Sequence, residues 1–408
     1  MKSPSKFYKE DLKNLLKSLV PKCSTHIQII NEIPQRKFDY IFIPNTFSFL
    51  DDTQDFLKRI KTNNCYEDSR VVIIYFNFLW KSILDLTTFI GLRKKVRKEP
   101  NWLTSKDIDN IFKLEGFEKI RSGKRLLLPL DFGILSTFIN KYIAQLPLIN
   151  NLCLTCYRIY RPVKKTKEYS VSIIIPARNE QGNITDILNK LPVMGNKTEV
   201  IFVEGHSKDN TYEVIKEEIS RCENKNVSAR LFKQKGTGKA NAVRLGFQKA
   251  KNDILIILDA DLTVTPKDLE KFYNALANGV CDFANGSRLV YPLEKDSMML
   301  LNYMGNSLFS TAFTYLIGQY VKDTLCGTKA LFKKDYERIA ANRKEFGDFD
   351  PFGDFDLLFG ATKLNLKICD IPVRYHERVY GKTNISRFVH GWLLVKMTIF
   401  AAKKIKFI

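Results

Sequence analysis

The stretch DILIILDAD (253–261) decides the fold that this sequence predicts. Five apolar residues run without a break from Ile254 to Leu258, which is typical of a β-strand buried on both faces. Asp259 and Asp261 follow, and carboxylates at i and i+2 project from the same side of an extended chain. At the carboxyl end of a strand such a pair can hold a divalent cation and leave positions open for a diphosphate. The stretch therefore predicts a buried strand that ends in a cation site.

Strands and amphipathic helices alternate before this stretch, and the alternation gives the D-x-D motif its meaning. By itself a D-x-D motif is a weak signal, because most examples are solvated turns. The alternation predicts an α/β fold with a mostly parallel, doubly wound sheet that binds ligands at the carboxyl ends of its strands. Strands are expected at 170–177, 199–205, 227–234 and 253–261, and helices at 184–191 (with Asn183 as its cap), 209–222 and 239–251.

Ordered motifs continue across residues 170–390. They read SIIIPARNE (172–180), EVIFVEGHSKDNT (199–211), KQKGTGKANAVRLG (233–246), LDAD (258–261), NGSR (285–288), DTLCGTKALF (323–332), FDPFGDFDLL (349–358) and YGKTNISRF (380–388). This series resembles the family-2 glycosyltransferases of the GT-A fold, close to dolichol-phosphate mannose synthase and polyprenyl-phosphate sugar transferases. The resemblance implies a Rossmann-like GT-A domain that transfers a sugar from a nucleotide-sugar donor.

The resemblance also implies roles for single residues at the donor. Asp259 and Asp261 bind Mg²⁺ or Mn²⁺ together with the diphosphate, Asp261 more directly, and Glu204 stands where the family usually has Asp. Lys235 and Lys239 fit a flexible loop beside the base and diphosphate, although two surface lysines on a turn would look the same. The donor site implied in full consists of Pro176, Arg178, Glu180, Glu204, Asp209, Lys235, Lys239, Asp259 and Arg288.

At the acceptor, the resemblance points to an acidic pair and to basic residues. Asp261, Asp354 and Asp356 are the expected catalytic residues, and Lys382 and Arg387 meet phosphate charge. Asp354 has a second interpretation as the N-cap of a helix over 357–364. A sugar hydroxyl must lose a proton and would require an aspartate base. A phosphomonoester is already largely dianionic at neutral pH, so a polyprenyl phosphate needs positioning and charge neutralisation instead.

Charge is distributed unevenly along the 408 residues. Residues 1–167 hold 30 basic and 16 acidic side chains, residues 168–373 hold 27 of each, and residues 374–408 hold 8 and 1. Both basic flanks interleave charge with bulky apolar residues, as in RKKVRK (93–98) and GWLLVKMTIFAAKKIKFI (391–408). This mixture suits an anionic membrane surface, and a solvated basic face is the alternative. No motif for nucleic-acid recognition accompanies the charge.

Apolar content is 45%, which supports a packed core, but no stretch of about 18 apolar residues predicts a transmembrane helix. The uncharged segment 297–321 has a helical face that would touch a membrane, a partner subunit or the protein core. The N-terminus lacks the apolar region of a secretory signal. Eight scattered cysteines then indicate reduced thiols, and Cys153 with Cys156 is read as packing rather than as a metal or redox site.

The N-terminal region shows a second resemblance. FDYIFIPNTFSFLDDTQDFLKRI (38–60), RVVIIYFNFLW (70–80) and NWLTSKDIDNIFKLEGFEKI (101–120) are similar to the later half of a class I SAM-dependent methyltransferase. Strands are expected at 38–44 and 70–76, helices at 53–61 and 105–114, a strand pair within 116–128, and then a helical apolar stretch over 126–160. No D-x-G-x-G-x-G loop precedes residue 38, so the pocket for SAM is incomplete. The region is either a remnant that serves docking or stability, or Met1 is not the natural start.

Together these observations predict four segments: a partial methyltransferase-like α/β domain (1–130), a connecting segment (131–167), a family-2 glycosyltransferase domain (168–390) and a basic amphipathic tail (391–408). The predicted function is inverting, metal-dependent transfer of a sugar to a polyprenyl phosphate by an enzyme held peripherally at the cytoplasmic face of a membrane. A glycan or glycolipid hydroxyl as acceptor and a non-catalytic membrane scaffold are the two alternatives. The sequence leaves the nucleotide, the sugar and the oligomeric state open.

Overall fold

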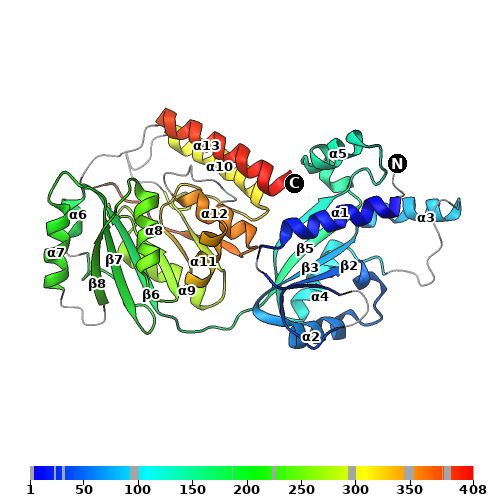
Figure 1. The fold of residues 1–408 in the computed structure, drawn as a ribbon, viewed down its shortest axis with the longest axis horizontal. Helices are drawn as coiled ribbons and strands as arrows, with labels where there is room; N and C mark the ends of the chain where they lie inside the picture. Colours follow the sequence, from blue (N-terminus) through cyan, green and yellow to red (C-terminus); the bar gives the residue numbers. More distant parts are fainter. Residues whose placement is uncertain are drawn as a thin grey trace. The chain divides into compact units, whose positions relative to one another are not determined.

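The structure is a computed structural model, and it describes residues 4–22, 24–29, 33–91, 101–185, 187–222, 227–292, 300–343, 353–378, 380 and 387–407. The chain forms two compact units (Figure 1). Unit 1 comprises residues 1–164 and 403–408, and unit 2 comprises residues 165–402. The predicted linker around Pro162 and KKTK (164–167) contains the first boundary between the two units.

Unit 2 is built on a seven-stranded sheet within the described residues. The four strands predicted from the sequence lie side by side and parallel, and β11 runs antiparallel between β9 and β10. The order across the sheet is β12 (Ile368–Pro372), β10 (Phe283–Ser287), β11 (Lys329–Phe332), β9 (Ile254–Ile257), β6 (Val171–Ala177), β7 (Thr198–Glu204) and β8 (Val227–Lys233).

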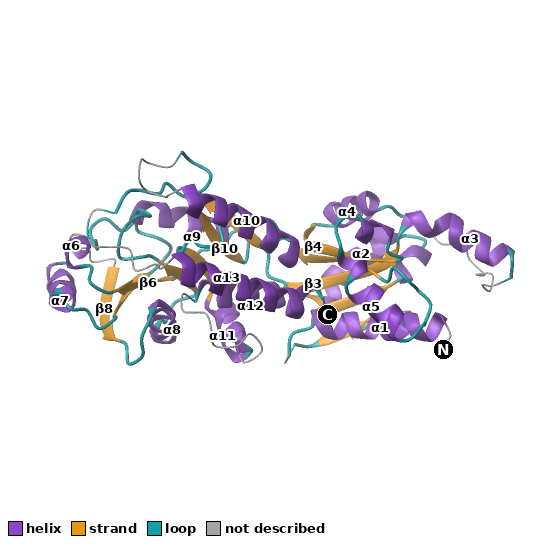
Figure 2. Cartoon of the chain, turned by 90° about the horizontal axis from the view of Figure 1, so that it is seen from above, coloured by secondary structure: helices purple, strands orange, loops and turns teal. Residues whose placement is uncertain are grey.

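Helices pack on both faces of this sheet, as a doubly wound fold requires (Figure 2). Ile173 and Ile175 of β6 belong to the core cluster that includes α7 (Thr211–Arg221) and α9 (Leu269–Ala277). Ile174, between them, faces the opposite side, where Gly246 of α8 (Lys239–Lys249) packs directly against it. Successive residues of a strand point to opposite faces, so the continuous apolar run of β6 fills two cores.

One predicted helix of unit 2 is wrong in its position. The structure has a single helical turn, α6 (Gln181–Ile184), followed by turns, where the sequence predicts a helix over 184–191. Asn183 lies inside α6 and its side chain donates to Glu180 Oε2 at 2.6 Å, so it does not cap a helix. Ile187, Leu188 and Leu191 are still buried, which shows that the apolar spacing reflects core packing without a helix.

The remaining helices of unit 2 come after β10 in the sequence. They are α10 (Leu300–Ile317), α11 (Lys333–Ala341), α12 (Asp354–Lys363) and α13 (Arg387–Ala401), and α13 continues into a π-helical segment at Ala402–Lys406. The two helices α10 and α13 lie side by side (Figures 1 and 2). Phe313 of α10 is buried and stacks on Phe359 of α12 at 5.3 Å, while Leu308 is 70% exposed. The predicted apolar face of α10 therefore contributes to the core and also leaves apolar surface outside it.

No helix among the described residues is both long enough and apolar enough to cross a membrane.

Unit 1 contains a five-stranded sheet within the described residues. The order is β1 (His26–Gln28), β2 (Phe38–Pro44), β3 (Cys65–Phe76), β5 (Thr155–Pro162) and β4 (Phe117–Arg125), with β1, β2 and β3 parallel and β5 antiparallel to both of its neighbours. Its helices are α1 (Pro4–Leu19), α2 (Thr53–Asn64), α3 (Lys81–Phe89), α4 (Ser105–Leu114) and α5 (Ile134–Lys141), joined by the short helices η1 (Thr46–Phe49), η2 (Phe78–Trp80), η3 (Ile143–Gln145) and η4 (Ile149–Leu152).

The sequence prediction is wrong for the second half of unit 1. Residues 117–125 form one strand, and its partner is β5, which lies inside the stretch expected to be helical. Local periodicity misses β5 because its two partners, β3 and β4, are distant in sequence, and only their pairing on both sides of β5 makes it a strand. Cys156 of β5 and the adjacent Cys153 are both buried, which supports the interpretation that this cysteine pair serves packing.

Candidate active site

The predicted donor residues gather at one edge of the unit 2 sheet. Ala177 at the end of β6 pairs with Glu204 at the end of β7, and Glu204 pairs with Lys233 at the end of β8. Asp259 and Asp261 follow the end of β9 at the same edge, because β9 is parallel to β6. The antiparallel β11 begins there, so residues 323–328, which precede it, also reach this edge.

Each carboxylate of the D-x-D motif is paired with a cation. Lys239 Nζ, from the first residue of α8, lies 2.6 Å from Asp259 Oδ1. Arg378 donates to Asp261 Oδ2 at 2.5 Å, and its other terminal nitrogen lies 3.4 Å from Glu180 Oε1. The far oxygen of Asp261 accepts the Thr263 hydroxyl at 2.8 Å, which fixes the direction of the carboxylate. Three acids and two bases thus share one small region.

Glu180 is the acid with the most altered protonation in this region. Burial raises the pKa of Glu180 to about 7, although Asn183 and Arg378 act in the opposite direction, and Asp261 and Asp259 raise it further. Its side chain is only 11% exposed. Glu180 therefore exchanges a proton near neutral pH, whereas an ordinary glutamate is fully charged there.

Hydrogen bonds join the three loops that follow β6, β7 and β8. Asn179 N donates to the Ser207 hydroxyl at 3.0 Å, and Lys208 N donates to Asn179 Oδ1 at 2.8 Å. The His206 ring lies 3.1 Å from the Gly236 carbonyl oxygen, so the second loop contacts the glycine-containing turn before α8. These bonds hold the loops next to one another at the edge of the sheet.

Two buried acceptor atoms at this edge lack a hydrogen-bond partner among the described residues. They are Glu204 Oε2 and Gln234 Oε1, at the ends of neighbouring strands, while Glu204 Oε1 accepts Ser207 N at 2.5 Å. A buried acceptor without a partner costs free energy, so such an atom calls for a donor that a ligand can supply. The N–H groups of a nucleotide base are donors of this kind.

The other predicted donor residues differ in what they contact. Arg178 and Lys235 are exposed, and Pro176 is half-buried at the end of β6. Asp209 holds protein groups: it accepts Thr211 N at 3.1 Å and the Thr211 hydroxyl at 2.5 Å. The contacts of Asp209 therefore fix the loop before α7.

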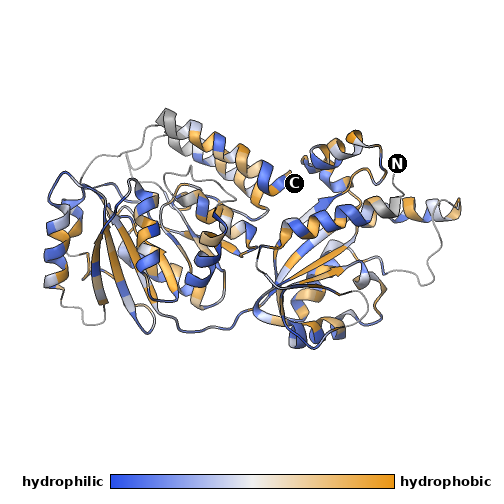
Figure 3. Ribbon diagram, viewed as in Figure 1, coloured by the Kyte–Doolittle hydropathy of each residue, from blue (hydrophilic) through white to orange (hydrophobic). Residues whose placement is uncertain are grey.

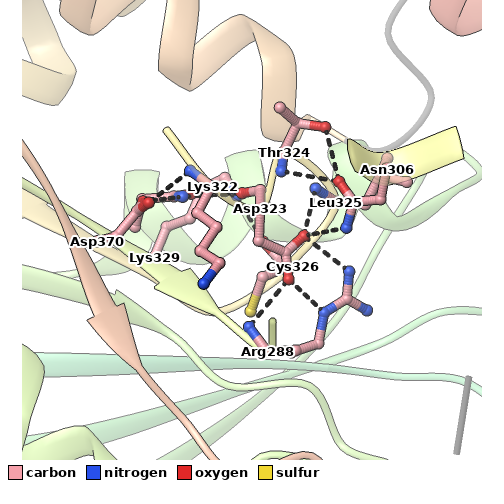
Figure 4. A network of polar contacts seen from close by, with 10 residues as sticks. Arg288, Asn306, Lys322, Asp323, Thr324, Leu325, Cys326, Lys329 and Asp370 are labelled. Carbon is pink, nitrogen blue, oxygen red and sulfur yellow. Dashed lines mark hydrogen bonds and ion pairs between the residues drawn. The ribbon is translucent and has the colours of Figure 1, made fainter. Parts of the chain in front are cut away.

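Arg288 belongs to a buried polar network (Figure 4). Its Nε and Nη2 donate to the two oxygens of Asp323 at 2.7 and 2.9 Å, and its backbone N donates at 3.0 Å. Asp323 also accepts Asn306 Nδ2 at 2.8 Å and Leu325 N at 3.0 Å. Burial raises the pKa of Asp323, but the Arg288 guanidinium and these hydrogen bonds outweigh burial and hold it well below its usual range. The network fixes the loop that starts at Asp323.

That loop reaches the D-x-D motif through Gly327. A Cβ atom added at Gly327 would fall on Asp259 Oδ2 and Lys239 Nζ, so the glycine backbone lies directly against this ion pair. No other residue type has room there without moving the pair. The buried network of Figure 4 fixes the start of the loop that carries Gly327. It therefore fixes the position of the backbone that lies against Asp259.

The predicted acceptor residues are placed only in part. Asp354 is the first residue of α12, and a Cβ at the preceding Gly353 would lie 3.2 Å from Ala240 Cα, beside Lys239. Asp356 forms ion pairs with Arg343 at 2.7 Å and Arg244 at 3.4 Å. Lys382 and the side chains of Asp354 and Arg387 lie outside the described residues, so their predicted roles stay predictions.

The acids at this edge suit a hard divalent cation. Mg²⁺ and Mn²⁺ prefer carboxylate oxygens, and a ligand diphosphate supplies further oxygens. Among the described residues no cluster of three His, Cys, Asp or Glu side chains forms a complete cation cage. Asp259 and Asp261 therefore fit a cation that arrives together with a diphosphate.

Two residues of the site were missed in the sequence. Arg378 stands two positions before the YGKTNISRF segment, in HERVYG (376–381), and only the fold shows that it reaches Asp261. Asp323 opens the DTLCGTKALF segment between Lys322 and Thr324, and only the fold shows that it is buried against Arg288.

Comparison with known proteins identifies the family that part of the chain matches. Residues 172–339 match the family described as "Glycosyl transferase family 2". The chain is 29% identical over 245 residues to a UDP-N-acetylglucosamine–dolichyl-phosphate N-acetylglucosaminyltransferase of Methanococcus voltae, across 56% of this chain and 96% of that protein. It is 35% identical over 122 residues to a dolichol-phosphate mannosyltransferase of Pyrococcus furiosus, across 29% of this chain and 33% of that protein.

A bacterial relative and a solved structure extend the comparison. An undecaprenyl-phosphate 4-deoxy-4-formamido-L-arabinose transferase of Edwardsiella ictaluri is 30% identical over 218 residues, across 52% of this chain and 62% of that protein. Glucosyl-3-phosphoglycerate synthase of Mycobacterium tuberculosis superposes with a TM-score of 0.42 at 15% identity, across 58% of this chain and 80% of that one. The family match covers β6 to α11 and confirms the family predicted from the motifs. The second unit therefore contains a family-2 glycosyltransferase domain, and this unit has the α/β fold of the GT-A class.

Proposed function

We propose that this enzyme transfers a sugar from a nucleotide-sugar donor to a polyprenyl phosphate, with inversion at the anomeric carbon. The observation that carries the proposal is the pairing of Asp259 with Lys239 and of Asp261 with Arg378 at the carboxyl edge of the sheet. These acids suit a cation bound to the donor diphosphate, and these bases suit its phosphate oxygens. Glu204 Oε2 and Gln234 Oε1, nearby on the same edge, suit the N–H groups of the base.

The proposed reaction is a direct displacement in which no protein side chain forms a bond to the sugar. The acceptor oxygen bonds to the anomeric carbon from the face opposite the diphosphate, and the carbon–oxygen bond to the diphosphate breaks with its electron pair leaving on the diphosphate. Asp259 and Asp261 would hold Mg²⁺ or Mn²⁺, which would neutralise the charge that develops on the leaving group. Lys239 and Arg378 add fixed positive charge beside the same oxygens, and the loop with Gly327 keeps Lys239 in place.

A lipid phosphate is the acceptor that fits these residues best. A phosphomonoester enters with its nucleophilic oxygen already deprotonated, so no general base is required. Asp356, one of the two predicted acceptor acids, forms ion pairs with two arginines, which favours a structural role over that of a base. The relatives named for dolichyl and undecaprenyl phosphate transfer support the same acceptor class. Such an acceptor places the enzyme at a membrane surface, and we assign it to the cytoplasmic face, where nucleotide sugars are expected.

The test is transfer from a panel of GDP- and UDP-sugars to a polyprenyl phosphate in detergent, with Mg²⁺ or Mn²⁺ and with EDTA. We expect a lipid-linked sugar that requires the metal and that disappears in Asp261→Asn. Glu217→Gln, which changes an exposed acid of α7, is the matched control and should retain activity. Donor binding without a lipid product would transfer the acceptor role to a sugar hydroxyl, with Asp354 as the base to test next. Absence of donor binding in the wild type would favour the non-catalytic scaffold.

A further inference from the structure

Unit 1 exposes apolar side chains on two segments that lie outside the strands of its sheet. Residues 78–90 hold six exposed large hydrophobic residues, and residues 130–152 hold nine. Phe89, Ile134 and Leu148 are 87%, 90% and 83% exposed. Scattered exposed apolar residues are ordinary, but a contiguous apolar surface marks an interaction site.

The two segments leave the sheet at the same place. Phe76, which ends β3, and Arg125, which ends β4, both pair with Thr155, which begins β5. The segment after β3 and the segment between β4 and β5 therefore start side by side. Trp80 Nε1 donates to the Leu152 carbonyl oxygen at 2.8 Å, and Asn77 Nδ2 donates to that of Cys153 at 2.9 Å. The exposed residues of both segments thus belong to one end of unit 1.

Helix α5 has the reverse of the usual arrangement for a soluble protein. Its buried residue is the polar Ser136, whose hydroxyl donates to the Leu130 carbonyl oxygen at 2.8 Å and accepts Phe132 N at 2.6 Å. Its exposed residues include Ile134, Leu135 and Phe138. Figure 3 shows the hydrophobic residues carried by α3 and α5. Serine inside and large apolar residues outside indicate that the outer face of α5 meets an apolar medium.

Helix α3 presents an apolar stripe in the same way. Leu79, Ile83, Leu86 and Ile90 follow a spacing of four, three and four residues, which places them on one face of a helix, and each is exposed. None of the residues Lys81–Phe89 is buried. An amphipathic helix whose apolar stripe faces outward is suited to lie in a membrane interface.

The charge around this apolar surface is positive. Lys81 is on α3 and Lys141 is on α5, and Asp85 and Asp131 are the acids of the same described segments. The tail of the chain adds exposed Lys403 and Lys404 to unit 1, where Phe407 contacts the Tyr142 ring at 5.7 Å. Anionic lipid head groups complement this charge, whereas a second copy of the chain would bring the same positive charge to the contact.

We propose that unit 1 docks on an anionic phospholipid bilayer through the apolar faces of α3 and α5 and the segment 142–152, with the surrounding lysines at the head groups. This gives unit 1 a role in binding a membrane. The inference complements the proposed function, since a lipid acceptor is reached from a membrane surface. It rests on unit 1 alone, so it can be tested independently of the transferase reaction.

The experiment compares vesicle binding by the full chain and by three variants of matched chemistry. Phe89→Glu and Ile134→Glu each place a carboxylate on the proposed docking surface, and Leu114→Glu places one on α4, where the leucine is also exposed to 62%. Because all three side chains are exposed, the variants should fold, and circular dichroism checks this. With phosphatidylcholine vesicles that contain phosphatidylglycerol, we expect partitioning to fall about tenfold or more for each of the first two and to stay unchanged for Leu114→Glu.

Charge and self-association give two further readouts. Vesicles of phosphatidylcholine alone should bind the wild type less, by about fivefold for each charge that contacts lipid. Equal binding by all three variants would overturn the proposal. So would Phe89→Glu splitting a dimer in solution while vesicle binding stays the same, because the surface would then join two copies. Sugar transfer in detergent separates the proposals: loss of vesicle binding with normal transfer supports docking, and absence of transfer with normal binding rejects only the proposed reaction.

Discussion

Asp323 gives the sharpest test of the buried network behind the active site. Asp323→Asn keeps the size of the side chain and removes its charge, leaving Arg288 with no carboxylate at the two positions where its guanidinium donates at 2.7 and 2.9 Å. Asp323 is fully buried, and the Arg288 side chain is 12% exposed. Breaking such a buried pair from one side costs about 3–5 kcal/mol, because the other charge stays behind without its partner. For a unit of this size that loss lowers the melting temperature by about 6–20 °C.

The assay is thermal unfolding of the purified chain, monitored by circular dichroism. Unfolding in urea gives a second measurement of stability. Glu217→Gln is the control, because Glu217 and its partner Arg221 are 61% and 72% exposed and such a pair contributes less than about 1 kcal/mol. The double variant Asp323→Asn with Arg288→Met removes the isolated charge, so it should be more stable than Asp323→Asn alone. A melting temperature for Asp323→Asn equal to that of the control, or a double variant that only sums the two losses, would refute the reasoning.

The pH dependence of the same pair has a definite sign. The pKa of Asp323 is lowered in the folded protein, so its contribution to stability is present above the ordinary range of aspartate and is lost as the pH falls below that range. Wild type should therefore lose its advantage over Asp323→Asn in acid, and the two unfolding curves should converge there. Denaturant titrations at a series of acidic pH values measure this convergence.

Three further predictions concern the site itself. Gly327→Ala should displace Lys239 and weaken donor binding about tenfold at nearly unchanged melting temperature, whereas Gly305→Ala, which has open space around it, should leave donor affinity unchanged in calorimetry. Glu180 has a raised pKa of about 7, so the metal-free wild type should lose stability as the pH rises from 5 to 8, and Glu180→Gln, which stays neutral, should not; parallel slopes in urea titrations would contradict this. Arg378→Gln should lower the affinity for nucleotide diphosphate about tenfold or more in the presence of metal, measured by competition, and an unchanged affinity would remove Arg378 from the phosphate site.

Sequence reasoning succeeds where the signal is local. The strands at 170–177, 199–205 and 227–234 are found to within a residue, because buried parallel strands are continuous apolar runs bounded by polar turns. The D-x-D pair was placed at the correct edge because its own strand is parallel to β6. The position of these acids in the fold was therefore predictable from residues next to them.

Reasoning of this kind fails where partners come from far along the chain. Strand β5 forms only because β3 and β4 pair with it from both sides. The local hydrophobic periodicity of the sequence does not predict this pairing. Arg378 reaches Asp261 across 117 positions, and Arg288, expected at the donor from its motif, forms an ion pair with Asp323. A motif fixes the residue type, but the opposing charge that each side chain meets is decided by the fold.

The pairing of Lys239 with Asp259 and of Arg378 with Asp261 stabilises the acids of this site in the absence of a ligand. Two carboxylates so close together would repel each other, and each has a counter-ion from the protein that removes this repulsion. The fold therefore does not need a metal to hold its acids in place. Under the proposed function, Lys239 and Arg378 would give up these carboxylates to a bound cation, and their charges would then lie beside the phosphates of the donor. Chelation should abolish sugar transfer and leave the unfolding temperature where it was.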